Sequence, residues 1–330
     1  MSNKKNVKSL LICNSNLFIP TVLTEVLSHP QEHYLIISDI ENIHRFFNFL
    51  VLTNIDYVEY GIKGHFDFIK EKRKLFSKVI HYNIGRVVFF HAEYGDMANW
   101  LIMKLSKTIP ICYCKIYDSI PAHHSRKLWK TLKIKLREWI YWGIDMDVLE
   151  HTSVFPSIPQ KFYNSVKASI VTMPVDMTLV TRYVASKIKD ENLYADYVLL
   201  TGTVVATGKA DAITYERLTN NIIDVLGIEK TVSKCHPRFK DLYGKEKELK
   251  QIPAYIPGNV LIENYACYVG FESTLLVEAA IAGKKSISLI DMLPLSVEAR
   301  QSIHVFFTSR LQGKGQILYP QSLEELEAFI

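Results

Sequence analysis

The stretch from Tyr268 to Ser286, YVGFESTLLVEAAIAGKKS, holds a complete strand–turn–helix unit of the predicted fold. A buried strand ends at Phe271, polar residues fill the turn, and an apolar helix runs to about Ala282. Gly283 then supplies a C-terminal cap before the next strand begins. This order is typical of a parallel sheet that is covered by helices.

The same alternation of strands and helices continues on both sides of this unit. In the first half, strands are expected at 7–14, 34–38, 57–60, 86–90 and 109–116, with helices near 18–28, 43–52, 66–76 and 96–106. In the second half, strands are expected at 197–201, 231–235, 260–262, 267–271 and 286–290, with helices at 214–226, 274–282 and from 322 onward. The order predicts an α/β architecture with parallel sheets.

Length and composition favour two domains. The chain has 330 residues, 48% of them hydrophobic and 22% charged, which excludes a disordered chain and allows a large core. A single core seldom exceeds about 250 residues. A stretch punctuated by Pro156, Pro159 and Pro174 separates the two runs of alternation. We therefore expect two Rossmann-like domains, residues 1–180 and 181–330, facing each other across a cleft.

The net charge of +5 is concentrated in one segment. Six cations and no carboxylate lie between Arg126 and Arg137, and the rest of the chain is close to neutral. This distribution argues against nucleic-acid binding and favours a single anionic docking surface. Residues 126–142 carry apolar and cationic side chains at helical spacings. They predict either an ordinary surface helix or peripheral contact with an anionic membrane.

Cysteine content and hydropathy indicate the cellular compartment in which the protein is expected. The five cysteines are an odd number without a C-x-x-C pair, which is typical of a reducing cytosol. No run approaches about eighteen apolar residues, and Asn14 interrupts the first apolar stretch, so neither a spanning helix nor a signal peptide is expected. We expect a cytoplasmic protein with peripheral contact on the inner face of the cell membrane.

Two motifs fall where strands of the second half end. His236, Pro237 and Arg238 follow one strand, and a histidine there can point into a ligand crevice and donate a proton near neutral pH. Ser273 and Thr274 begin the helix after a later strand, where free backbone N–H groups and two hydroxyls can hold a phosphate. The alternatives are a satisfied surface histidine and a simple helix cap.

These motifs resemble those of bacterial sialyltransferases that assemble lipooligosaccharide and capsular polysaccharide. The match consists of Cys-His236-Pro237-Arg238 and Gly270-Phe271-Glu272-Ser273-Thr274, within roughly residues 197–290. The resemblance implies a GT-B-like fold and an inverting, metal-independent sialyltransferase. Its donor would be CMP-sialic acid, without a cofactor. Its acceptor would be a terminal sugar, expected to be galactose, of a bacterial surface glycan.

The resemblance also implies roles for individual residues. His236 would be the general acid that protonates the departing CMP phosphate, and Ser273 and Thr274 would bind that phosphate. The remaining donor-binding candidates are Pro237, Gly202, Thr203 and Glu272. A single phosphate can leave with the help of a protonated histidine and helix-start donors, so no metal is expected. The adjacent histidines 123 and 124 do not share a helix face and make no metal cluster.

This chain lacks the acidic pair from which the family takes its general base. The family usually carries an acidic pair and a glycine before the His-Pro motif, but Ala206 and Thr207 precede Gly208 here. Asp211 is the first candidate for the base and Glu216 the second, although Asp211 is equally suited to cap the following helix. The amino-terminal half offers three further acids near strand ends, Glu93, Asp96 and Asp118.

Two other functions fit the same residues. One is transfer of another activated sugar, such as a related nonulosonic acid or Kdo. The other is a non-catalytic relative that binds a sugar nucleotide, which the missing acidic pair favours.

Overall fold

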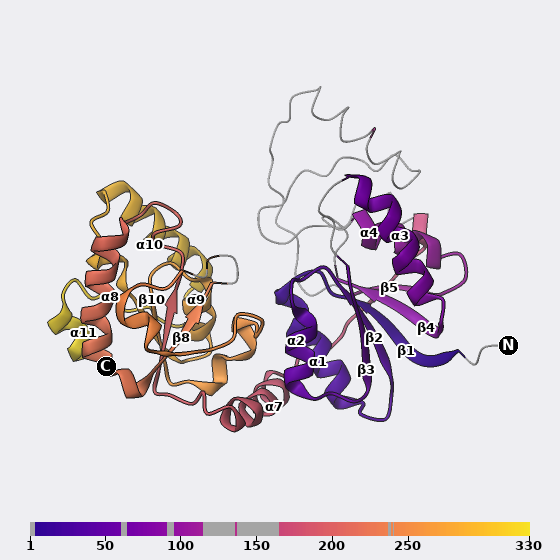
Figure 1. Ribbon diagram of the computed structural model, residues 1–330, viewed down its shortest axis with the longest axis horizontal. Helices are drawn as coiled ribbons and strands as arrows, with labels where there is room; N and C mark the ends of the chain where they lie inside the picture. The colour runs from indigo at the N-terminus through magenta and orange to yellow at the C-terminus, as the bar shows by residue number, and fades with distance from the viewer. Residues whose placement is uncertain are drawn as a thin grey trace. The chain divides into compact units, whose positions relative to one another are not determined.

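The computed structural model describes residues 4–60, 65–90, 96–114, 136, 165–236, 239 and 241–330. The chain forms two compact units, Met1–Asp176 and Met177–Ile330, and each has its own parallel sheet (Figure 1). Within the described ranges, no helix is both long and apolar enough to cross a bilayer. The basic stretch 126–142 lies outside the described residues except for Leu136, which is exposed.

The first unit is built on a six-stranded sheet in the order β3-β2-β1-β4-β5-β6, with all neighbouring strands parallel. Its strands are β1 (Lys5–Ile12), β2 (Tyr34–Ser38), β3 (Ile55–Glu59), β4 (Tyr82–Phe89), β5 (Ile111–Cys114) and β6 (Ser169–Val171). Its helices are α1 (Ile19–Ser28), α2 (Ile43–Leu50), α3 (His65–Val79) and α4 (Asp96–Leu105). Helices α1 and α2 lie on one side of the sheet and α3 and α4 on the other (Figure 1).

The strands of the first unit are apolar because helices cover both faces of the sheet. β2 is buried along its whole length, because a central strand of a parallel sheet is enclosed by helices on both faces. On one face, Leu10 and Val87 pack with Leu101 of α4 and Val79 of α3 in a single core cluster. Continuous apolar runs, and not alternating ones, are therefore the sequence pattern that this architecture requires.

The second unit is built on a five-stranded sheet in the order β11-β10-β7-β8-β9, again with parallel neighbours. Its strands are β7 (Tyr197–Thr201), β8 (Thr231–Cys235), β9 (Lys250–Gln251), β10 (Cys267–Gly270) and β11 (Lys285–Ser288). Its helices are α7 (Met177–Asp190), α8 (Ala212–Leu226), α9 (Thr274–Ile281), α10 (Val297–Leu311) and α11 (Leu323–Phe329). The expected α/β architecture with two Rossmann-type units is confirmed.

The strand expected at 260–262 is wrong. Two 3-10 turns, η4 (Gly258–Val260) and η5 (Ile262–Asn264), occupy this region. Val260 and Leu261 are fully buried in these turns, so the short apolar run reflects burial and not strand pairing. A run of this length does not separate a buried strand from a buried turn.

Candidate functional site

The sheet of the second unit changes direction at β7. From β7 the chain passes to β8 and β9 on one side, and it returns later to β10 and β11 on the other. In open α/β sheets, ligands bind outside the carboxyl ends of the strands at such a switch point. Thr201 pairs with Cys235, and Leu200 pairs with Gly270, so the segments after β7, β8 and β10 leave the sheet at one edge.

Gly202 brings the segment after β7 against the turn that carries His236. Its φ of +96° lies in the left-handed region, and an added Cβ would lie 2.5 Å from the carbonyl oxygen of Phe239. The backbone N–H of His236 donates to the carbonyl of Thr201 at 3.0 Å. A residue larger than glycine would therefore displace the His236 turn.

The imidazole of His236 is held on one side by an aromatic ring. It stacks on Phe239 with ring centroids 5.1 Å apart and an interplanar angle of 26°. The residue is half-buried, directly after the carboxyl end of β8. Pro237 and Arg238, the other residues of the predicted motif, lie outside the described residues.

Ser273 is the N-cap of α9. Its Oγ accepts a hydrogen bond from the backbone N–H of Leu275 at 3.3 Å, so the capping alternative is confirmed for this residue. Ser273 is half-buried and Thr274 is exposed. Both hydroxyls retain a proton to donate, and the first turn of the helix presents free N–H groups, so the cap does not prevent anion binding.

Glu272 connects the segments that follow β7 and β10. Its Oε1 accepts from Thr207 Oγ1 at 3.3 Å, and its Oε2 forms an ion pair with Lys209 Nζ. Only 17% of the Glu272 side chain and 26% of the Lys209 side chain are exposed. Desolvation in this position lowers the pKa of the Lys209 ammonium group. A charged pair therefore spans the switch point between β7 and β10.

The two predicted motifs flank the same strand. His236 follows β8, Ser273 follows β10, and β7 lies between them in the sheet. Two strand spacings separate the two strand ends by roughly 10 Å. Gly202 and Thr203 directly follow β7, between the two motifs in strand order.

Asp211 caps α8. Its Oδ1 accepts from the backbone N–H groups of Ile213 at 3.0 Å and Thr214 at 2.9 Å, and its Oδ2 accepts from Thr214 Oγ1 at 2.7 Å. These hydrogen bonds, with Thr214 first among them, lower the pKa of the Asp211 carboxyl group. The capping alternative is confirmed. A carboxylate with a lowered pKa is a weaker general base, since proton transfer is best near neutrality.

The other candidate bases are placed less favourably. Glu216 is exposed on α8, one turn or more beyond the cap. Glu93 and Asp118 lie outside the described residues, and Asp96 begins α4 with a side chain that is also outside them.

Two acidic residues that sequence reasoning missed have environments suited to proton transfer. Desolvation raises the pKa of Glu278, on α9 one turn after Thr274, to about 7. Desolvation by the surrounding protein also raises the pKa of Asp39, directly after β2 in the first unit, to about 6, while the residue stays accessible to solvent. The i,i+4 spacing of Thr274 and Glu278 was visible in the sequence, but the burial that shifts this carboxyl group was not.

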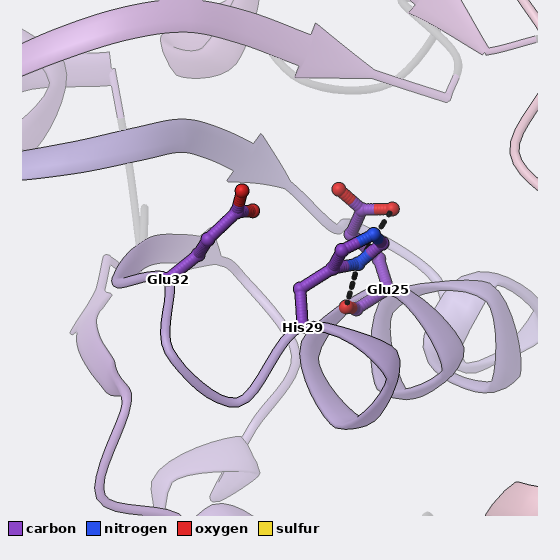
Figure 2. Close-up of side chains that lie close together, drawn as sticks. All are labelled: Glu25, His29 and Glu32. Atoms are coloured by element: carbon purple, nitrogen blue, oxygen red, sulfur yellow. Dashed lines mark hydrogen bonds and ion pairs between the residues drawn. The ribbon is translucent and has the colours of Figure 1, made fainter.

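A cluster in the first unit has the ligand types of a metal site. Figure 2 shows Glu25 on α1, His29 at the C-cap of that helix and Glu32 in the turn that follows. Their candidate ligand atoms lie within 4.8 Å of one another. Two cations already neutralise these carboxylates. Arg86 Nη2 lies 3.3 Å from Glu25 Oε1, and Lys8 Nζ pairs with both Glu25 and Glu32. The cluster is a partly exposed ion network, and its charge balance does not favour a divalent cation.

No family model matches the chain, and no curated protein matches it. Among solved structures, the wall teichoic acid polymerase TagF, as a histidine variant with CDPG, has a TM-score of 0.52 and 10% identity, covering 98% of this chain and 78% of TagF. UDP-GlcNAc 2-epimerase from Neisseria meningitidis has a TM-score of 0.44 and 10% identity, covering 98% and 89%. MurG from Acinetobacter baumannii has a TM-score of 0.39 and 13% identity, again covering 98% and 89%.

The similarity to TagF extends over almost the whole chain and therefore concerns both units. Together with the two parallel sheets, it gives the chain a GT-B-like α/β fold. At these identities the likeness defines the fold alone.

Proposed function

We propose that this protein is a glycosyltransferase that binds a nucleotide-activated sugar at the carboxyl edge of the second sheet. One observation carries the proposal: the segments after β7, β8 and β10, which hold the predicted donor residues, leave the sheet at one carboxyl edge, where β7 and β10 form the switch point. The GT-B-like fold, shared with the polymerase TagF that was solved with CDPG, supports a transferase with a nucleotide-linked donor.

More specifically, we propose an inverting, metal-independent sialyltransferase that takes sialic acid from CMP-sialic acid. The His236 and Ser273-Thr274 motifs support this donor, because a nucleoside monophosphate leaving group needs one proton and a few N–H and O–H donors. The acceptor is a terminal sugar, galactose in our proposal, of a bacterial capsular or lipooligosaccharide glycan. Neither a metal nor a cofactor is part of the proposal.

The proposed transfer breaks one bond of the donor, forms one bond to the acceptor and moves two protons. The bond between the anomeric carbon and the phosphate oxygen of CMP breaks, and the acceptor hydroxyl oxygen bonds to that carbon from the opposite face. His236 gives its proton to the departing phosphate oxygen, and Ser273 and Thr274 donate hydrogen bonds to the phosphate. The acceptor proton passes to a carboxylate that acts as general base. Asp211 is the sequence candidate for this role, and its lowered pKa makes it a weak base, which Asp211→Asn tests.

The test is product analysis with CMP-sialic acid and a panel of galactosides, with a chelator present. We expect transfer in the wild type and a loss of about 100- to 1000-fold in kcat for His236→Ala. His33→Ala is the control, since His33 is a half-buried histidine of the first unit that precedes β2 and contacts Asp56 at 3.1 Å. Wild-type turnover in His236→Ala would remove the role of His236.

Two alternative functions predict different results. A transferase of a related nonulosonic acid or Kdo would turn over its own activated donor and not CMP-sialic acid. A non-catalytic relative would be stabilised by the nucleotide sugar in a thermal-shift assay and yield no product.

Peripheral contact with anionic lipid through residues 126–142, at the inner face of the membrane, is proposed from the sequence alone. Cosedimentation with anionic vesicles that persists after Lys130, Lys133 and Lys135 are neutralised would contradict it.

A further inference from the structure

The ion pair between Lys209 and Glu272 occupies the place where an anionic donor would arrive. Glu272 directly precedes Ser273, the N-cap of α9, and Lys209 belongs to the loop that follows β7. Thr207 Oγ1 also lies 3.3 Å from this carboxylate, but its shorter hydrogen bond, at 2.8 Å, is to the carbonyl of Thr203 in its own turn. The group that the internal carboxylate engages is therefore the ammonium group of Lys209, a good phosphate donor.

The loop holds Lys209 and Thr207 in a fixed position next to β7. The backbone N–H of Thr207 donates to the carbonyl of Thr203 at 2.9 Å, and that of Lys209 donates to the carbonyl of Val204 at 3.0 Å. Val204 is itself buried. The backbone is therefore a compact turn, and an exchange of partners at Lys209 requires only side-chain rotation.

The electrostatics of the pair favour an exchange of anions. Desolvation lowers the pKa of Lys209, so its ammonium form gains from an anionic neighbour in this partly buried position. The carboxylate of Glu272, in turn, repels any phosphate that approaches Ser273 and Thr274. A phosphate that replaces Glu272 at Lys209 would restore the ion pair and turn the repelling carboxylate away from the site.

We propose that Glu272 is a placeholder anion, which holds Lys209 until the donor phosphate replaces it, and that Lys209 is a phosphate-binding residue in the bound state. This inference rests on the proposed function, because it takes the nucleotide phosphate as the incoming anion. Under this proposal Glu272 is not a ligand of the donor, as the sequence predicted, but competes with the donor phosphate for Lys209.

The experiment is isothermal titration of the full chain with CMP, and with cytidine as a probe that lacks the phosphate. Glu272→Gln removes the competing charge, and we expect at least about threefold tighter CMP binding. Lys209→Met removes the phosphate partner, and we expect about tenfold weaker binding or more. Cytidine affinity should change in neither variant, because cytidine has no anion to exchange.

Asp224→Asn is the matched control, since it removes the more exposed ion pair between Asp224 and Lys245 in the same unit and should leave CMP affinity unchanged. Weaker or unchanged CMP binding in Glu272→Gln would overturn the placeholder role, and unchanged binding in Lys209→Met would overturn the phosphate contact. These outcomes leave the proposed function intact if the wild type binds CMP and transfers sialic acid. No CMP binding to the wild type would overturn both the CMP-sialic acid donor and the placeholder role of Glu272.

Discussion

At the scale of single residues, Glu278 shows how burial alone sets a protonation state. It lies on α9, and desolvation raises its pKa from 4.5 to about 7. No hydrogen bond or ion pair to its carboxyl group is present among the residues that the structure describes. A buried carboxyl group without a compensating cation favours its neutral form, because the charged form loses its hydration.

Glu278→Gln should remove a pH dependence of stability. An acid whose pKa is higher in the folded state loses stability as pH rises from about 4.5 to about 7, because the folded protein must give up a proton that it holds more tightly. Relative to wild type, we expect Glu278→Gln to gain up to about 3 kcal/mol in free energy of unfolding between pH 4.5 and pH 8. Urea unfolding at the two pH values measures this difference.

Glu229→Gln is the control for that comparison, since Glu229 is an exposed glutamate of the same unit. Equal effects of Glu278→Gln at both pH values would contradict the raised pKa.

The roles of residues that depend only on their neighbours in the chain could be predicted from the sequence. The roles that depend on tertiary contacts could not. Ser273 and Asp211 were recognised as possible caps because an N-cap depends on the next three residues. The close approach of Gly202 to Phe239 and the engagement of Lys209 by Glu272 depend on strands far apart in the sequence. Nothing in the local sequence reports such contacts.

At the scale of elements, the cap of α8 separates a structural role of Asp211 from a catalytic one. Asp211→Ala removes an acceptor of three hydrogen bonds, and we expect it to lower the free energy of unfolding. Asp211→Asn should cost less, because the amide oxygen still accepts from the N–H groups of Ile213 and Thr214. Denaturant unfolding of both variants measures the difference.

The sialic acid transfer assay with Asp211→Asn then tests whether Asp211 is the general base. We expect turnover to be retained, because the hydrogen bonds that lower the pKa of Asp211 also make it a weak base. A loss of about 100-fold or more, with stability retained, would instead assign the acceptor proton to Asp211.

Elements with a strong pattern were predictable, and short or weakly patterned ones were not. The central strands β7 and β10 are continuous apolar runs next to turn residues, and they lie where the sequence predicted them. β9 has two residues and β6 has three, which is too short for a pattern. α10 buries only Phe307 of its fifteen residues, so it lacks the apolar stripe that marks a helix in the sequence.

At the scale of the whole molecule, both units repeat one arrangement, a parallel sheet that starts in its centre and grows outward in two directions. In the first unit the switch falls between β1 and β4, and in the second between β7 and β10. The alternating pattern predicted the parallel sheets. The strand order, and with it the position of the switch, comes from right-handed crossovers and packing, which the sequence pattern does not encode.

The assignment of the nucleotide to the second unit predicts where CMP protects the chain. Hydrogen exchange of the full chain, with and without saturating CMP, should show slower exchange in residues 201–210 and 271–278, which follow β7 and β10. Ligand binding slows exchange because it raises the free energy of local opening. Peptides from α11 (Leu323–Phe329) serve as an internal reference, because this helix packs on α8 and its Phe329 carbonyl accepts from Lys285 at the amino end of β11. Protection confined to the carboxyl ends of β1 and β4 would place the nucleotide in the first unit and contradict the donor site argued from the switch point of the second.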